Sequence, residues 1–125
     1  MLNYITSYYI THPHKLIQEL YLDVKWFIQR GRRGYSDSDV WNIFGYLLKI
    51  LPPMIRQLRR NKIGYPTHLT AEKWAMILYQ METGLDDAKQ LSEFDWKDDN
   101  EMKFLQKSAD RGLDLFHKHF YSLWD

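Results

Sequence analysis

The sequence predicts an all-α protein, a single-domain bundle of five or six helices over residues 1–125, and three observations lead to this prediction. Apolar residues recur at spacings of three and four along most of the chain. Capping residues, glycines and prolines divide these stretches at regular intervals. No stretch of useful length alternates polar and apolar residues as a strand does, and we find no internal repeat.

The first third of the chain predicts an arm followed by a long helix. Residues 1–11 are rich in tyrosine and are expected to form a short turn or an N-terminal arm. Pro13 suits the first position of a helix, and the apolar stripe after it predicts a helix over residues 14–30. Gly31 and Gly34 are expected to end that helix, because glycine adopts left-handed backbone conformations without a Cβ clash.

A second helix is expected to begin after Ser36. Asp39 stands three residues after this serine, which is close to a capping box. Pro52 and Pro53 interrupt the apolar pattern, and proline removes a backbone hydrogen bond and clashes with the preceding turn. We therefore expect this helix to be kinked or broken there, and to restart over residues 54–61.

The remainder of the chain predicts two longer helices and a short one. Thr70 as N-cap and Gly84 as a stop signal delimit the third helix. Residues 85–91 form a shorter segment. Asp98, with an acid three residues later, predicts the N-cap of a last helix over residues 99–123.

Composition and charge limit the classes of function. The chain has no cysteine, which excludes disulfides and thiolate metal sites. It has no apolar run near the ~20 residues of a membrane span and no visible signal peptide, so we expect a soluble, cytoplasmic protein without a membrane partner. Residues 1–65 hold ten Lys/Arg against four Asp/Glu, and residues 66–125 hold seven against twelve. This asymmetry indicates either an anion-binding face or two halves that neutralise each other.

The segment of residues 26–41 concentrates cationic and aromatic side chains, and reads W-F-I-Q-R-G-R-R-G-Y-S-D-S-D-V-W. Guanidinium groups pair with phosphates and flat rings stack on bases, so the pattern suits a nucleotide or phosphate site. The alternative is a structural turn, in which the tryptophans pack and an aspartate pairs with an arginine. The predicted ligand-binding residues of this segment are Trp26, Arg30, Arg33, Tyr35, Asp37, Asp39 and Trp41.

Three more arginines, Arg56, Arg59 and Arg60, share one face of a helix and could meet phosphates. An ordinary solvated face is the alternative. We add these arginines and Tyr65 to the predicted ligand-binding residues. Sequence-specific DNA binding is disfavoured, because the formal net charge is only +1 and no DNA-binding motif is recognisable.

Catalytic and metal-binding signals are sparse. Asp110, Asp114 and His117 line one face of the last helix and could contribute to a divalent metal site, but no partner helix with facing acids can be identified. No nucleophile triad, phosphate-binding loop or dinucleotide motif is found. We therefore expect no metal, no cofactor and no enzymatic activity, and keep a metal-dependent hydrolase as a third hypothesis.

Several blocks together resemble a family of small, uncharacterised bacteriophage proteins. They are the W-x-x-Q-R-x-x-R-G-[WY]-x-D-x-D-x-W core at residues 26–41, G-Y-P at 64–66, L-T-A-E-K-W at 69–74 and the ending L-D-L-F-H-K-H-F-Y-S-L-W-D at 113–125. The resemblance covers roughly residues 20–125 and implies a phage-encoded product in the host cytoplasm. It implies no activity. His119 stands where many relatives have tyrosine.

The sequence leads to two hypotheses about function. The first is a non-enzymatic phage protein that sequesters a phosphate-bearing nucleotide signal through residues 26–41 and so counters host defence. The second is a protein-interaction inhibitor of a host defence protein, or a phage assembly factor, with an aromatic surface that includes Tyr4, Tyr8, Tyr9 and residues 120–124. So many aromatic side chains are hard to bury in one small bundle, which also makes a homo-oligomer possible.

Overall fold

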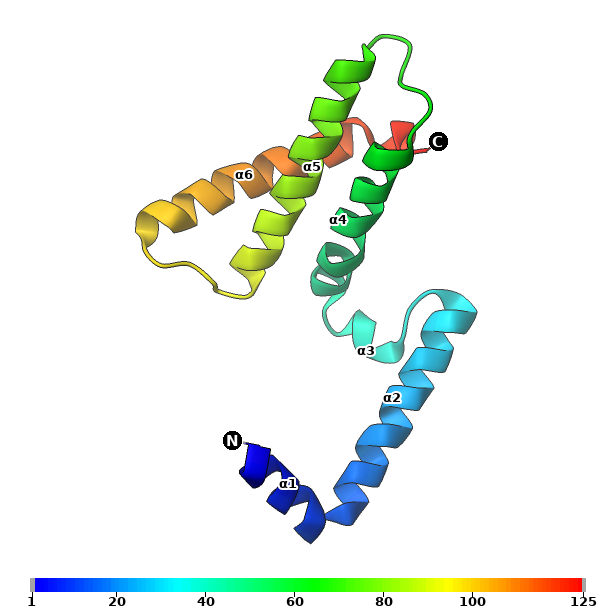
Figure 1. Ribbon diagram of the computed structural model, residues 1–125, viewed down its shortest axis with the longest axis vertical. Coiled ribbons are helices and arrows are strands. Elements are labelled where there is room, and N and C mark those ends of the chain that lie inside the picture. Colours follow the sequence, from blue (N-terminus) through cyan, green and yellow to red (C-terminus); the bar gives the residue numbers. More distant parts are fainter. Residues whose placement is uncertain (1, 125) are drawn as a thin grey trace. The chain divides into compact units, whose positions relative to one another are not determined.

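The computed structural model describes residues 2–124, and their side chains from residue 5 onward, so the side chains of Tyr4 and Asp125 lie outside the described part of the chain. Over residues 2–124 the chain forms six α-helices and one short 3-10 helix and no strand, which confirms the predicted all-α class (Figure 1). The chain divides into two compact units, Met1–Ile43 and Phe44–Asp125.

The first unit contains α1 (Leu2–Thr11), α2 (Pro13–Arg33) and the one-turn helix α3 (Asp37–Val40). The N-terminal segment is a helix and not the expected turn. Its last residue, Thr11, is tied to the preceding turn, because its hydroxyl donates to the backbone carbonyl of Tyr8 at 2.9 Å. Pro13 then starts α2 as the sequence predicts.

The end of α2 depends on one of the two predicted glycines. Gly31 lies inside the helix, which continues to Arg33. Gly34 takes a left-handed conformation with φ of 86°, and its N–H donates to the carbonyl of Arg30 at 2.9 Å. A side chain would strain this conformation, so Gly34 is the residue that ends the helix.

The capping box at Ser36 is confirmed, but the helix it starts is only one turn long. The Ser36 side chain accepts from the N–H of Asp39, and the Asp39 carboxylate accepts from the N–H of Ser36 at 2.8 Å. A turn at residues 41–42 follows, and α4 then runs from Ile43 to Asn61. The second predicted helix is therefore two helices, α3 and α4.

The second unit contains α4, α5 (Ala71–Ser92), α6 (Asp99–Lys118) and the 3-10 helix η1 (Phe120–Ser122). Of the predicted kink or break at the two prolines, the break does not occur, because α4 continues through both of them, and the kink stays a prediction. Pro52 is fully buried, next to the buried positions Leu48 and Ile55 on the same face. Burial of this apolar face offsets the lost backbone hydrogen bonds.

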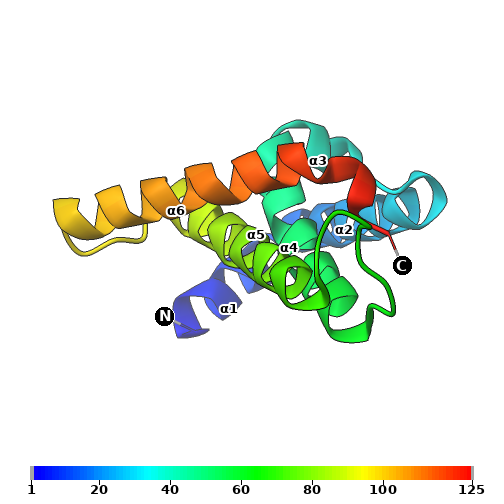
Figure 2. The same cartoon turned by 90° about the horizontal axis from the view of Figure 1, so that it is seen from above.

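The third and fourth predicted segments are one helix, because α5 continues through Gly84. Gly84 faces Gly112 of α6: a Cβ added to Gly84 would lie 2.6 Å from the Gly112 Cα atom, and a Cβ added to Gly112 would lie 2.7 Å from the Gly84 Cα atom. Figures 1 and 2 both show α6 crossing α5 obliquely. The two glycines therefore permit a close helix crossing and do not end a helix.

The core of the second unit is built around α5. Its buried apolar side chains pack with those of α4, and the α6 residues Leu105 and Ala109 are also buried. Predicted N-caps set the starts of both later helices: the Thr70 side chain accepts from the N–H of Lys73, and the Asp98 carboxylate accepts from the N–H of Glu101. The central cluster consists of Leu48, Ile55, Trp74, Leu78, Met81 and Leu85.

Candidate functional site

The predicted arginine and aromatic cluster forms a closed turn between α2 and α3. The Arg30 guanidinium donates two hydrogen bonds to the Asp39 carboxylate, at 3.0 and 2.7 Å. The Arg33 guanidinium pairs with Asp37, donates to the carbonyl of Tyr35 at 2.9 Å and lies over the Tyr35 ring, 4.4 Å from its centre. Both arginines thus have acidic partners within the same segment.

The rest of the segment closes the same turn. The Gln29 side chain accepts from the N–H of Asp37 and donates to its carboxylate, both at 2.9 Å. Trp26 and Trp41 meet edge to face, with ring centres 5.8 Å apart. Every residue type of the W-x-x-Q-R-x-x-R-G-Y-x-D-x-D-x-W pattern therefore has a contact or a backbone role within the turn.

The aspartates of this turn are held in their charged form. Hydrogen bonds from Arg30, together with the Ser36 N–H and hydroxyl, lower the pKa of Asp39 well below its usual range. Hydrogen bonds from Gln29 and Arg33 lower the pKa of Asp37 as well. This geometry matches the alternative interpretation of the segment, a structural turn in which aspartates pair with arginines. Phosphate binding by Arg30 and Arg33 stays a prediction.

The three arginines of the second predicted cluster, Arg56, Arg59 and Arg60, do not act together. Arg56 and Arg59 of α4 both bond the buried carboxylate of Glu82 in α5, with Nε–O distances of 2.6 and 3.1 Å. The pKa of Arg56 is raised by its hydrogen bond to Glu82. Arg60 is exposed and is not part of this pairing. Two of the three predicted arginines thus fasten α4 to α5.

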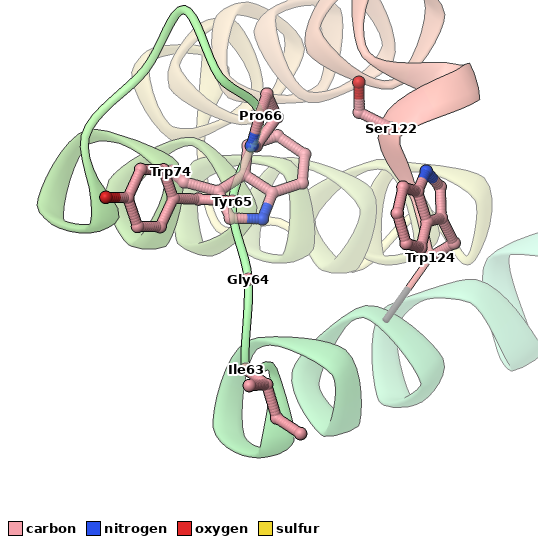
Figure 3. Close-up of a pocket in the computed structure, with 7 residues that line it drawn as sticks. All are labelled: Ile63, Gly64, Tyr65, Pro66, Trp74, Ser122 and Trp124. Carbon is pink, nitrogen blue, oxygen red and sulfur yellow. The ribbon is translucent and has the colours of Figure 1, made fainter.

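Tyr65 is separate from the arginines and lines a pocket of about 350 Å³ between the α4–α5 loop, the start of α5 and the C-terminal segment. Figure 3 shows the rings of Tyr65, Trp74 and Trp124, which come from these three parts of the chain. The lining holds no charged side chain. The pocket therefore suits an apolar or aromatic group better than a phosphate.

Beside this pocket, His119 is buried and meets Trp74 edge to face, with ring centres 5.7 Å apart. Burial is the main cause that lowers the pKa of His119, and the charges of Lys118 and His68 act in the same direction. His119 is thus held neutral, as part of the packing around Trp74.

An apolar groove of about 410 Å³ lies between α4 and the end of α6 with η1. The α4 side chains follow a helical i, i+3, i+4, i+7 pattern, and the side chains on the other wall are aromatic or leucine. Met54 and Phe120 remain 61% and 51% exposed, so the groove is open to a ligand. It is lined by Leu51, Met54, Ile55, Leu58, Phe116, Phe120 and Leu123.

Sequence reasoning found only part of this groove. The apolar spacing of α4 and the aromatic C-terminal segment are both visible in the sequence. Two features of the groove are not visible in the sequence. One is that α4 continues through its prolines, and the other is that η1 turns Phe120 and Leu123 toward α4. Both depend on tertiary packing, which the local pattern does not contain.

The remaining predicted groups form no further site in the described part of the chain. Among residues 5–124, no cluster of three or more His, Asp or Glu side chains has the arrangement of a metal site, and Asp110, Asp114 and His117 are not brought together with other ligands. Within residues 2–124 no helix combines the length and apolar character required to cross a bilayer.

Comparison of the chain with models of known protein families, with curated proteins and with solved structures found no match.

Proposed function

We propose that this protein is a non-enzymatic protein-binding module, and that the α4–α6 groove holds an amphipathic helix of a partner protein. The observation that carries the proposal is the groove itself, an open depression of about 410 Å³ lined wholly by apolar side chains. An amphipathic helix fits such a groove by inserting apolar residues at i, i+3, i+4 and i+7.

The composition of the groove supports a helical peptide as ligand. Met54 is unbranched and polarisable, so it adapts to different apolar side chains. Phe116 and Phe120 meet edge to face with ring centres 5.4 Å apart and provide a large, rigid contact area. Such aromatic side chains are typical of the residues that dominate binding energy at protein interfaces.

The groove supports this proposal better than the arginines support nucleotide capture. The guanidiniums of Arg30, Arg33, Arg56 and Arg59 all bond carboxylates of the chain itself. A phosphate ligand would have to compete with these ion pairs, whereas the groove has no internal group to displace. Nucleotide capture is the competing hypothesis, and the experiment must distinguish it from the binding of a helix.

The resemblance to small phage proteins supports the further proposal that the partner is a host defence protein or a phage assembly component in an infected cell. The resemblance is the basis of that part of the proposal. The groove chemistry is independent of it and fits any partner that presents an apolar helix face.

The proposal is tested by selecting binders from a displayed library of amphipathic helices and measuring the affinity of the best peptide. We expect Met54→Glu to weaken binding by at least about tenfold, since it places a charge in an apolar contact. Gln57→Glu is the matched control, because Gln57 is exposed on the same helix outside the groove lining. It should leave the affinity unchanged.

Salt separates the two hypotheses. Apolar burial is not screened, so peptide binding should change little between roughly 50 and 500 mM salt, whereas capture of a phosphate by exposed cations weakens steeply over this range. Nucleotide binding that disappears at high salt, with no helical peptide retained by the groove, would overturn the proposal.

A further inference from the structure

The helix α2 carries a wide apolar stripe that no element in the described part of its own unit, residues 2–43, covers. No residue of α2 is buried. Seven apolar side chains within about three turns are between 40% and 77% exposed, namely Leu16, Ile17, Leu20, Tyr21, Val24, Phe27 and Ile28. At about 100° per residue they fall on one continuous face of the helix.

The contacts that α2 makes with its own unit use the opposite face. Toward α1, Tyr8 bonds Lys15, and the Tyr9 hydroxyl donates to Glu19 at 2.5 Å. Toward α3, the contacts use Trp26, Gln29, Arg30 and Arg33, and Lys25 lies 3.8 Å from Asp37. Helical geometry places Lys25 at the edge of the stripe and the other six α2 positions on the side of the helix away from it. The flanking segments thus hold α2 from behind and leave the stripe open.

We propose that the stripe is a self-association surface, on which α2 of a second copy of this chain packs in antiparallel orientation. Ile17, Leu20, Val24 and Phe27 have the a and d spacing of a heptad. In an antiparallel pair, Ile17 faces the partner's Phe27, and Leu20 faces the partner's Val24. Because the arrangement is two-fold symmetric, each layer occurs twice and the same surface serves both copies.

The exposed area of the stripe is comparable to that of a small dimer interface. Two of the seven side chains are aromatic and bury 150–250 Å² each, and the five aliphatic ones bury somewhat less, so at about half exposure they offer roughly 500–650 Å² per copy. A stable interface of standard size buries about 800 Å² per partner. The stripe therefore supplies most of the area that such an interface needs.

Orientation follows from the helix dipole. In the antiparallel pair, opposed dipoles bring each positive helix end near a negative one. A parallel pair would bring like ends together.

The first test is the mass of the full-length protein in solution, by sedimentation equilibrium at micromolar concentration. We expect twice the chain mass of 15.2 kDa for the wild type. Leu20→Asp should give a monomer, because it buries a charge at the centre of the interface. Leu22→Asp is the matched control: Leu22 is 37% exposed on the same helix, and its position lies outside the stripe. This variant should remain a dimer with unchanged helicity.

Orientation is tested by cross-linking, which the absence of native cysteine makes unambiguous. Under mild oxidation, the double variant Ile17→Cys/Phe27→Cys should form a reducible dimer, while Ile17→Cys alone should not, since only a parallel pair would juxtapose identical positions. A monomeric wild type, a dimer that survives Leu20→Asp, or cross-linking by the single variant in place of the double one would overturn the antiparallel model.

Discussion

Replacing either glycine of the α5–α6 crossing by alanine should destabilise the protein, although alanine is the better helix former. A new Cβ at Gly84 would lie 2.6 Å from both the Gly112 Cα atom and the Ser108 carbonyl oxygen. Carbon atoms in contact are normally 3.5–4.0 Å apart, so the helices must separate by about 1 Å. Both close contacts are with backbone, which cannot rotate away.

The magnitude follows from two opposing effects. Overpacking a close-packed site costs about 1–3 kcal/mol and occasionally more, and the widened crossing also loosens the buried contacts of Leu105 and Ala109. The gain in helix propensity from glycine to alanine is about 1 kcal/mol. We expect a net loss of about 1–3 kcal/mol in the free energy of unfolding for Gly84→Ala and for Gly112→Ala, measured by urea denaturation followed by circular dichroism.

Gly31→Ala provides the control with the opposite sign. Gly31 also lies within a helix, but an added Cβ meets nothing within 4 Å and the backbone is not left-handed. This variant should be more stable by about 0.5–1 kcal/mol. The close crossing would be refuted if Gly84→Ala and Gly112→Ala were as stable as the wild type or more stable.

Three further perturbations test the ion pairs and the buried histidine. The folded-state pKa of Asp39 is lowered, so the stability that its charged form contributes is present above the unfolded pKa of about 3.9 and is lost as pH falls below that value. Urea titrations between pH 2 and 6 should therefore show that Asp39→Asn is less stable than the wild type near pH 6 and loses less stability in acid. An unchanged acid slope would contradict the Arg30–Asp39 pairing. Glu82→Gln should lower the free energy of unfolding by about 2–4 kcal/mol, because it leaves Arg56 and Arg59 without their shared carboxylate. The control Asp86→Asn should lower it by less than about 0.5 kcal/mol, because Asp86 is half exposed and lies 3.5 Å from Arg56. Equal losses in the two variants would refute the central role of Glu82. The folded-state pKa of His119 is lowered, so as pH falls below about 6.5 the unfolded chain binds a proton at His119 before the folded chain does. The free energy of unfolding should therefore decline below about pH 6.5, and His119→Gln should remove part of that decline. The same pH dependence in the wild type and in His119→Gln would show that His119 is not held neutral.

The local signals of the fold were readable from the sequence because they depend on neighbouring residues. The Ser36 capping box and the Thr70 and Asp98 N-caps involve groups within three residues of one another, so the pattern contains the whole interaction. Gly34 as a left-handed cap is of the same kind.

The errors concern residues whose role is set by a distant part of the chain. Gly84 looks like a helix stop until Gly112 of α6 is placed against it. Pro52 looks like a helix breaker until its burial beside Leu48 and Ile55 is known. In each case the helix propensity of one residue is outweighed by packing of the face it lies on.

The arginine-rich segment shows a different limit. The sequence brought Arg30, Arg33, Asp37 and Asp39 together correctly but left open whether the guanidiniums face an anion or the aspartates. The left-handed turn at Gly34 folds the aspartates back onto α2, where Asp39 pairs with Arg30 and Asp37 pairs with Arg33. The partner of Arg56 and Arg59 could not be predicted from the local sequence, because Glu82 is more than twenty residues distant from both.

The central claim, that the α4–α6 groove binds a helix, is tested most directly by methyl NMR of methionine-labelled protein. Met54 lies in the groove, Met81 is buried in the core, and Met76 is exposed on α5 outside the groove. Titration with the best-binding amphipathic peptide should shift the Met54 methyl resonance and leave those of Met76 and Met81 in place. An unmoved Met54 signal at saturating peptide would contradict the claim.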